Sequence, residues 1–120
     1  MTFQKCCRLS GKKAFSDVFK QAVVSADASF KILGRDTGQP HARLGMAVSR
    51  QVDRRAVERN RLKRLIRESF RSHYLSDTQH RPVDIVVLPR RGAVSTSNRQ
   101  LLEQLSRHWG RIDARLSKEH

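Results

Sequence analysis

The segment Arg54–Tyr74 contains neither glycine nor proline and carries a helical pattern of apolar residues. At about 100° per residue, these side chains fall within one arc of a helix. A helix with such a stripe becomes stable when the stripe is buried, and a sheet is a natural surface to cover it. We therefore expect one long amphipathic helix packed on a sheet, with Asp53 as a candidate N-cap. The apolar arc comprises Leu62, Leu65, Ile66 and Phe70.

Strand-like segments lie on both sides of this helix. Ala22–Ser25 is short and β-branched, and Ser29–Arg35 alternates between two faces. Arg43–Ser49 alternates in the same way, so we expect it to pair with Ser29–Arg35 as a hairpin. Val83–Leu88 is mostly apolar, which is typical of a central strand.

Helical patterns also occur toward both ends of the chain. Ser10 is a candidate N-cap for a first helix that carries Phe15 and Phe19. Asn98–Leu116 predicts a last amphipathic helix. The 120 residues show no repeat or internal linker, so we expect one domain over residues 1–120, of the α+β class, with the order α-β-β-β-α-β-α. The core side of the last helix is expected to comprise Leu101, Leu102, Leu105, Trp109 and Ile112.

The charge balance points to a polyanionic partner. Lys and Arg number 25 against 11 Asp and Glu, which gives a net charge of +14. This excess is larger than solubility requires, and a pI near 11.4 is typical of a nucleic-acid-binding domain. Such a protein binds nucleic acid partly by releasing its counterions. A soluble basic protein without such a partner is the less favoured alternative.

Part of this charge lies on a second arc of the long helix, at the spacing i, i+3, i+4, i+7 and i+11. Glu58 and Glu68 lie toward the opposite flank with Arg61. A helix that needed only solubility would interleave both signs, whereas this one separates them. Because guanidinium groups grip phosphates in two-point geometry, the pattern favours RNA binding over an ordinary solvated face. This set, the basic ridge, comprises Asn60, Lys63, Arg64, Arg67 and Arg71.

The pattern expected of an independent protein enzyme is absent from the sequence. Asp84 stands alone inside a strand, and Glu58 and Glu68 are too far apart along one helix to act as a catalytic pair. The 5 His residues show no metal-ligand spacing, and no glycine-rich phosphate loop follows a strand. The sequence therefore favours RNA binding over catalysis by the protein itself.

The sequence predicts a cytoplasmic protein. Lys5 and Arg8 interrupt the first residues, and no long apolar region follows them. No apolar run approaches the roughly 20 residues needed to cross a bilayer. Cys6 and Cys7 are adjacent and lack zinc-ligand spacing, so we expect free thiols.

The run Arg59-Asn60-Arg61, followed by Lys63-Arg64 and Arg67-Glu68, strongly resembles the RNR signature of the bacterial ribonuclease P protein component. The three-residue motif alone is weak evidence. The similarity extends over nearly the whole chain, which makes it specific. The other matching features are Arg8-Leu9, Phe15, Phe19, the strands Phe30–Arg35, Leu44–Arg50 and Val83–Leu88, the last helix and Trp109.

The resemblance implies a fold and a function. The fold is a two-layer α/β sandwich similar to the second domain of ribosomal protein S5. Its β-α-β crossover through the long helix is left-handed, against the usual rule. The function is that of a monomeric protein subunit, in a 1:1 complex with a catalytic RNA, of an endoribonuclease that removes the 5′ leader of precursor tRNA. The RNA carries the catalysis with bound magnesium, the protein supplies no catalytic residue, and neither membrane nor DNA is a partner.

The resemblance also implies two RNA-binding surfaces. The surface facing the catalytic RNA is expected to comprise Arg54, Arg55, Arg59, Asn60, Arg61, Lys63, Arg64, Arg67 and Arg71. A cleft between the first helix and the sheet is expected to hold the single-stranded leader through Lys12, Lys13, Phe15, Phe19, Phe30 and Lys31. Basic grooves with aromatic platforms suit single strands, although the spacing of Phe15 and Phe19 also fits a core. The alternative function is a ribosomal or RNA-chaperone protein that binds structured RNA without cleavage.

Overall fold

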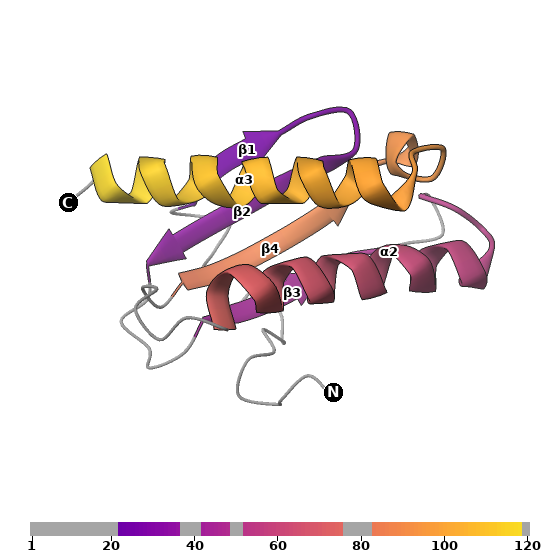
Figure 1. The fold of residues 1–120 in the computed structure, drawn as a ribbon, viewed down its shortest axis with the longest axis horizontal. Coiled ribbons are helices and arrows are strands. Elements are labelled where there is room, and N and C mark those ends of the chain that lie inside the picture. Colours follow the sequence, from indigo (N-terminus) through magenta and orange to yellow (C-terminus); the bar gives the residue numbers. More distant parts are fainter. Residues whose placement is uncertain (1–21, 37–41, 49–51, 76–82, 119–120) are drawn as a thin grey trace.

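The computed structural model describes residues 22–36, 42–48, 52–75 and 83–118, and these form a four-stranded sheet with two helices on one face (Figure 1). The α+β class is confirmed. The expected first helix lies outside the described residues. The elements are β1 (Val23–Ala26), β2 (Phe30–Asp36), β3 (Arg43–Met46), α2 (Ala56–Phe70) with a π-helical turn (Arg71–Leu75), β4 (Val83–Pro89), a 3-10 turn (Arg91–Ala93) and α3 (Asn98–Lys118).

The strands follow the order β1-β2-β4-β3. β4 pairs antiparallel with β2 and parallel with β3, so the predicted hairpin between Ser29–Arg35 and Arg43–Ser49 is wrong. The prediction of Val83–Leu88 as a central strand is confirmed. Residues 83–87 are all buried, so β4 has apolar side chains to cover on both faces. A place between two other strands satisfies both backbone edges and surrounds the side chains of β4 with those of its neighbours on each face.

The parallel strands β3 and β4 are joined through α2. In Figure 1 both strands point to the right, β4 lies above β3, and α2 lies in front of the sheet. The chain therefore turns in a left-handed sense from β3 through α2 to β4. This is the crossover that the resemblance implies, and it departs from the right-handed rule.

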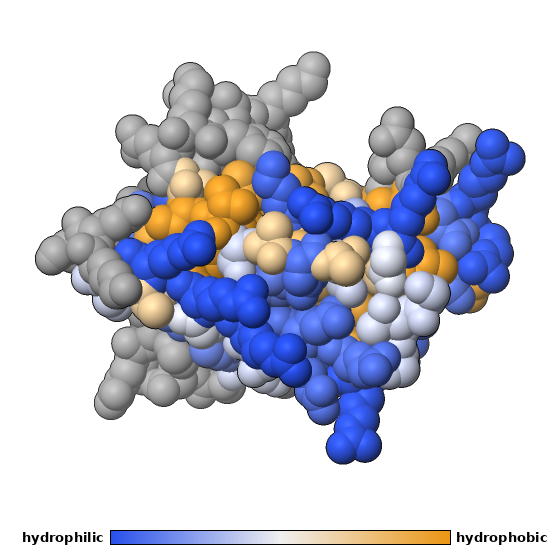
Figure 2. Space-filling model, turned by 90° about the horizontal axis from the view of Figure 1, so that it is seen from above, coloured by the Kyte–Doolittle hydropathy of each residue, from blue (hydrophilic) through white to orange (hydrophobic). Residues whose placement is uncertain are grey.

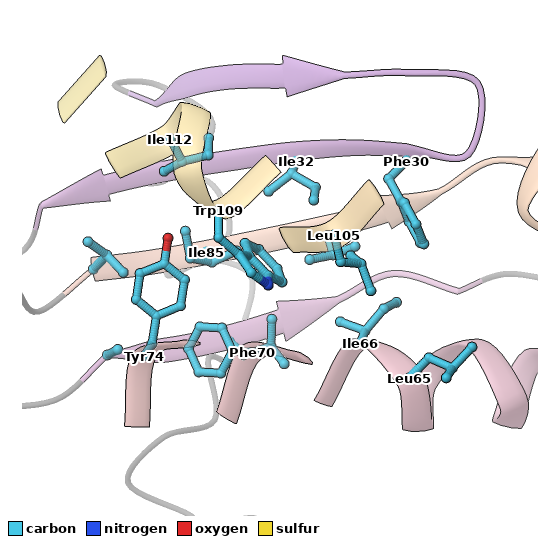
Figure 3. Packing of buried hydrophobic residues seen from close by; sticks show 14 of the residues in the cluster. Phe30, Ile32, Leu65, Ile66, Phe70, Tyr74, Ile85, Leu105, Trp109 and Ile112 are labelled. Atoms are coloured by element: carbon cyan, nitrogen blue, oxygen red, sulfur yellow. The ribbon is translucent and has the colours of Figure 1, made fainter. Parts of the chain in front are cut away.

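The hydrophobic core lies between the two helices and the sheet (Figure 3). The predicted stripe of α2 is buried, as are the predicted core residues of α3 except Leu102, which is 37% exposed. Leu102 follows buried Leu101 by one position, and this turns its side chain by about 100° away from the sheet. Trp109 joins the helices: its ring meets Phe70 edge-on at 6.1 Å, and its Nε1 donates to Ser69 Oγ at 2.7 Å.

The opposite face of the sheet is apolar at its centre and also holds an ion pair. Leu33 and Val86 are buried there. The guanidinium of Arg43 donates two hydrogen bonds of 2.7 Å to the carboxylate of Asp84, which is 1% exposed. The hydrogen bond to Asp84 raises the pKa of Arg43. Asp84, the lone carboxylate of the strand, therefore serves as a structural partner of Arg43.

Candidate nucleic-acid interface

The N-terminus of α2 is built by a turn of charged residues. Asp53 was expected to be the N-cap, but α2 begins at Ala56 and Arg55 occupies the cap position. Asp53 acts two residues earlier: its Oδ1 accepts the Arg55 N–H at 2.7 Å, and its carboxylate contacts the Arg55 guanidinium at 3.2 and 3.0 Å. These hydrogen bonds from Arg55 lower the pKa of Asp53. Arg59 closes the turn by donating to the carbonyl oxygens of Asp53 and Arg54, at 3.0 and 2.8 Å.

The basic ridge runs along α2 opposite its buried stripe. Asn60, Arg64 and Arg67 are exposed, and Lys63 and Arg71 are half-buried. Within the described part of the chain, none of these five side chains makes a hydrogen bond or an ion pair. Arg54, at the start of the helix, is exposed as well. The ridge therefore presents a row of donors that are available to phosphate groups.

The flanks of α2 place its acidic residues away from the ridge, as predicted. Glu58 accepts a hydrogen bond of 2.9 Å from Arg61, one helical turn further on. Glu68 is exposed. Like charges stacked on one helix face weaken the isolated helix, and burial of the apolar stripe in the core offsets that cost. The electrostatic repulsion along the ridge decreases when an anion binds there.

Arg61 belongs to the RNR motif, yet its guanidinium points away from the basic ridge. The side chain is 25% exposed and bridges α2 to the segment that leads into α3. Its role is therefore internal, which motif and spacing did not reveal. The partners of the guanidinium are the Glu58 carboxylate at 2.9 Å, Asn98 Oδ1 at 2.6 Å and the carbonyl oxygens of Ala93, Val94 and Thr96 at 3.4, 3.0 and 3.4 Å.

The predicted leader cleft requires a correction at Phe30. Its ring is fully buried on the helix-covered face of the sheet, where it meets the His108 ring edge-on at 6.2 Å. It offers no surface on which a base could stack. Successive strand residues point to opposite faces, so the neighbouring Lys31 lies on the other face, where it is exposed. The remaining predicted cleft residues, Lys12, Lys13, Phe15 and Phe19, lie outside the described residues.

Among residues 22–36, 42–48, 52–75 and 83–118, no three His, Cys, Asp or Glu side chains lie together so that they could hold a metal ion. Among the described helices, none is both long and apolar enough to cross a membrane.

An α+β sandwich that presents a one-sided, arginine-rich helix defines a class of small basic RNA-binding proteins. The family model for ribonuclease P matches residues 3–113. The chain is 40% identical over 111 residues to the ribonuclease P protein component of Thioalkalivibrio sulfidiphilus, covering 92% of this chain and 89% of that protein. It is 42% identical over 107 residues to that of Methylococcus capsulatus, covering 89% and 81%. The chain belongs to the ribonuclease P protein family.

Solved structures agree with this assignment. The ribonuclease P protein of Staphylococcus aureus superposes with a TM-score of 0.79 at 29% identity, over 88% of this chain and 94% of that one. The Thermotoga maritima protein superposes with a TM-score of 0.70 at 31% identity, over 83% and 92%. The resemblance and the fold that it implies are confirmed. The alternative of a ribosomal or RNA-chaperone protein receives no support from these comparisons.

Proposed function

We propose that this chain is the protein subunit of a ribonuclease P holoenzyme, in which an RNA subunit removes the 5′ leader of precursor tRNA. The observation that carries the proposal is the basic ridge: five polar side chains without a partner among the described residues, in a chain of this family. The protein acts as a monomer in a 1:1 complex with the RNA, in the cytoplasm.

The basic ridge is the docking surface for the catalytic RNA. Its residues follow the spacing i, i+3, i+4, i+7 and i+11, so their head groups form a line that can follow a phosphate backbone. Arg54, Arg55 and Arg59 add positive charge around the N-terminus of α2, where the Arg55 and Arg59 side chains also hold the turn before the helix. Arg61 contributes indirectly, because it fixes α2 against the segment before α3. Contacts of this kind position the RNA and carry no sequence preference.

The sheet face opposite the helices is the surface for the leader. Lys31 is exposed there, beside the apolar Leu33 and Val86. We propose that Lys12, Lys13, Phe15 and Phe19 complete the cleft from the first helix. Phe30 is left out of this set because its ring lies in the core. A single strand needs a basic groove with aromatic platforms, which the first helix would supply.

Catalysis is proposed to lie on the RNA subunit, which also binds the magnesium ions. Three carboxylates of the described residues have structural partners: Asp84 is held by Arg43, Asp53 by Arg55, and Glu58 by Arg61. The role of the protein is then to hold the catalytic RNA and the leader together. Simultaneous contact with both RNAs raises the effective concentration of substrate at the catalyst.

A cleavage assay with purified components tests this function. Labelled precursor tRNA is incubated at low magnesium with protein alone, with catalytic RNA alone and with both. We expect the protein alone to be inert and the mixture to cleave faster than the RNA alone. Leader removal by the protein alone would overturn the assignment of catalysis, and a failure to stimulate the RNA would overturn the role as subunit.

A further inference from the structure

A second row of arginines lies on α3. Arg107, Arg111 and Arg115 recur every fourth residue and are all exposed. At about 100° per residue they fall on one side of the buried stripe of α3. Asp113 falls on the other side, where it contacts Tyr74 from the end of α2 at 2.9 Å. Arg107, Arg111 and Arg115 therefore lie on the side of α3 away from α2.

These arginines lie beside β1, an edge strand of the sheet. Arg111 contacts Ser25 Oγ at 3.5 Å, and Arg115 donates to the main-chain oxygen of Val24. Arg107 makes no hydrogen bond or ion pair with any other described residue. Figure 2 views the molecule from the side of β1 and α3 and shows strongly hydrophilic residues next to an apolar patch. We call Arg107, Arg111 and Arg115 with the edge of β1 the α3–β1 surface.

Neighbouring carboxylates leave this positive charge uncompensated. Asp27 lies nearby, but its Oδ2 contacts His108 Nε2 at 2.8 Å and its Oδ1 accepts the N–H groups of Ser29 and Phe30. Glu103, one turn before Arg107, pairs instead with Arg99, one turn further toward the N-terminus of α3, at 3.6 Å. The α3–β1 surface therefore carries three guanidinium groups, none of which forms an ion pair with a described acid.

The α3–β1 surface and the basic ridge point in different directions. The two helices contact each other through Trp109 and Ser69, and each row of cations lies on the side of its helix away from that contact. One stretch of RNA backbone bound along the ridge cannot also follow the α3–β1 surface. Whatever binds the α3–β1 surface is thus separate from an RNA segment bound along the ridge.

We propose that the α3–β1 surface binds the phosphate backbone of a double-helical RNA segment. Arginines four residues apart are about 6 Å apart along the helix axis, so they can contact several phosphates of one strand. No described aromatic side chain is exposed at this surface, and single strands are normally bound with stacking platforms. Backbone contact without stacking suits a helical RNA, which is recognised by shape and phosphates. The inference rests on the proposed function, since the RNAs of the holoenzyme are the natural source of such a segment.

The test uses a blunt RNA hairpin without single-stranded tails and the full-length protein with Arg64→Gln and Arg67→Gln, which weaken the basic ridge. Into this double variant we introduce Arg107→Gln alone or Arg107→Gln together with Arg111→Gln. The affinity of each protein for the hairpin is measured by fluorescence anisotropy over a range of salt concentrations. Arg99→Gln is the matched control: it removes the same charge from an exposed position of α3 two turns before Arg107.

We expect the Arg107→Gln/Arg111→Gln pair to weaken hairpin binding at least fivefold. The slope of log affinity against log salt concentration should decrease in magnitude by about 0.9 for each phosphate that is no longer neutralised. Arg99→Gln should leave both unchanged, and Arg107→Lys should largely restore binding. Equal effects of Arg107→Gln and Arg99→Gln, or no effect of either, would overturn the inference. Because Arg107 has no partner among the described residues, its single variant remains informative if the double variant unfolds. Leader cleavage by the wild-type protein with catalytic RNA is measured in parallel. A failure of the proposed function would appear in this cleavage assay, whereas a failure of the present inference would appear only in hairpin binding.

Discussion

The guanidinium of Arg61 donates a hydrogen bond to Oδ1 of Asn98 across 2.6 Å and thereby ties α2 to the first residue of α3. The same guanidinium donates to the carbonyl oxygen of Val94 at 3.0 Å. One side chain of α2 thus holds both the Asn98 side chain, at the start of α3, and the Val94 carbonyl group, in the segment before it. The RNR motif consequently combines a structural residue with residues that face outward.

Replacing Arg61 with alanine should lower the free energy of unfolding by about 1–3 kcal/mol, because carbonyl groups of the segment before α3 lose their charged donor. Urea denaturation followed by circular dichroism measures the change. Arg64→Ala is the matched control, since Arg64 is exposed and its side chain bonds to no other described residue. Equal stability of the two variants would show that the Arg61 hydrogen bonds are unimportant for the fold.

The basic ridge should show the opposite behaviour. Arg64→Ala and Arg67→Ala should each weaken binding to the catalytic RNA and lower its salt slope by about one unit, with little change in unfolding. Filter binding at several salt concentrations provides the slope. If these variants melt the fold and leave the salt slope untouched, the ridge is structural and the docking proposal is wrong.

The buried stripe of α2 should determine stability without contributing to RNA binding. Leu65 is 6% exposed, and Leu65→Ala should lower the free energy of unfolding by about 2–5 kcal/mol, because apolar burial decreases and a cavity forms. Leu102→Ala, at 37% exposure on α3, should cost markedly less. Thermal denaturation compares the two variants, and a larger destabilisation at Leu102 would contradict the packing described here.

His108 should make the stability depend on pH. The imidazole lies between Ser25 Oγ at 2.7 Å and the Asp27 carboxylate at 2.8 Å, which suits a neutral ring protonated on Nε2. Burial lowers the pKa of His108 below 6.5, against the opposing pull of Asp27 and with a smaller lowering contribution from the Arg111 charge. Burial acts to raise the pKa of Asp27, but the backbone hydrogen bonds from Phe30 and Ser29 and the contact with His108 outweigh it and lower that pKa below 3.8.

As the pH falls below about 6.5, the unfolded chain takes up a proton at His108 that the folded chain resists. The contribution to stability is therefore complete above this pH and decreases below it. Asp27 adds a further destabilisation at more acidic pH, as its carboxylate is protonated in the folded state. The melting temperature should fall between pH 7 and pH 5, and His108→Gln should flatten this fall. The same pH profile in both proteins would exclude His108 as the cause.

Local patterns in the sequence predicted the elements that depend on one helix or one strand. The buried stripe and the basic ridge of α2 follow from the helical period, and the central place of β4 follows from its apolar run. The alternation of two faces predicted for Ser29–Arg35 is confirmed at its start, where Phe30 is buried and Lys31 is exposed. The sequence pattern of one strand does not determine which face of the sheet the helices cover, because that depends on tertiary packing. The prediction of Phe30 as a leader-cleft residue is therefore wrong, since its ring lies in the core.

Features that join distant segments were not predictable from periodicity. The pairing of β3 with β4 is set by the strand order of the whole sheet. The partners of Arg61 lie more than thirty positions further along the chain, at Val94 and Asn98. His108 meets Ser25 and Asp27 only because α3 packs on β1 and β2. No spacing rule connects residues that are brought together in this way.

Site-specific crosslinking in the assembled holoenzyme tests the central claim most directly. A photoreactive amino acid replaces Asn60 on the basic ridge in one protein and Lys31 on the opposite sheet face in another. We predict that position 60 crosslinks to the catalytic RNA and position 31 to the leader of precursor tRNA. Crosslinking of position 60 to the leader, or to neither RNA while the holoenzyme is active, would contradict the assignment of the basic ridge as the docking surface for the catalyst.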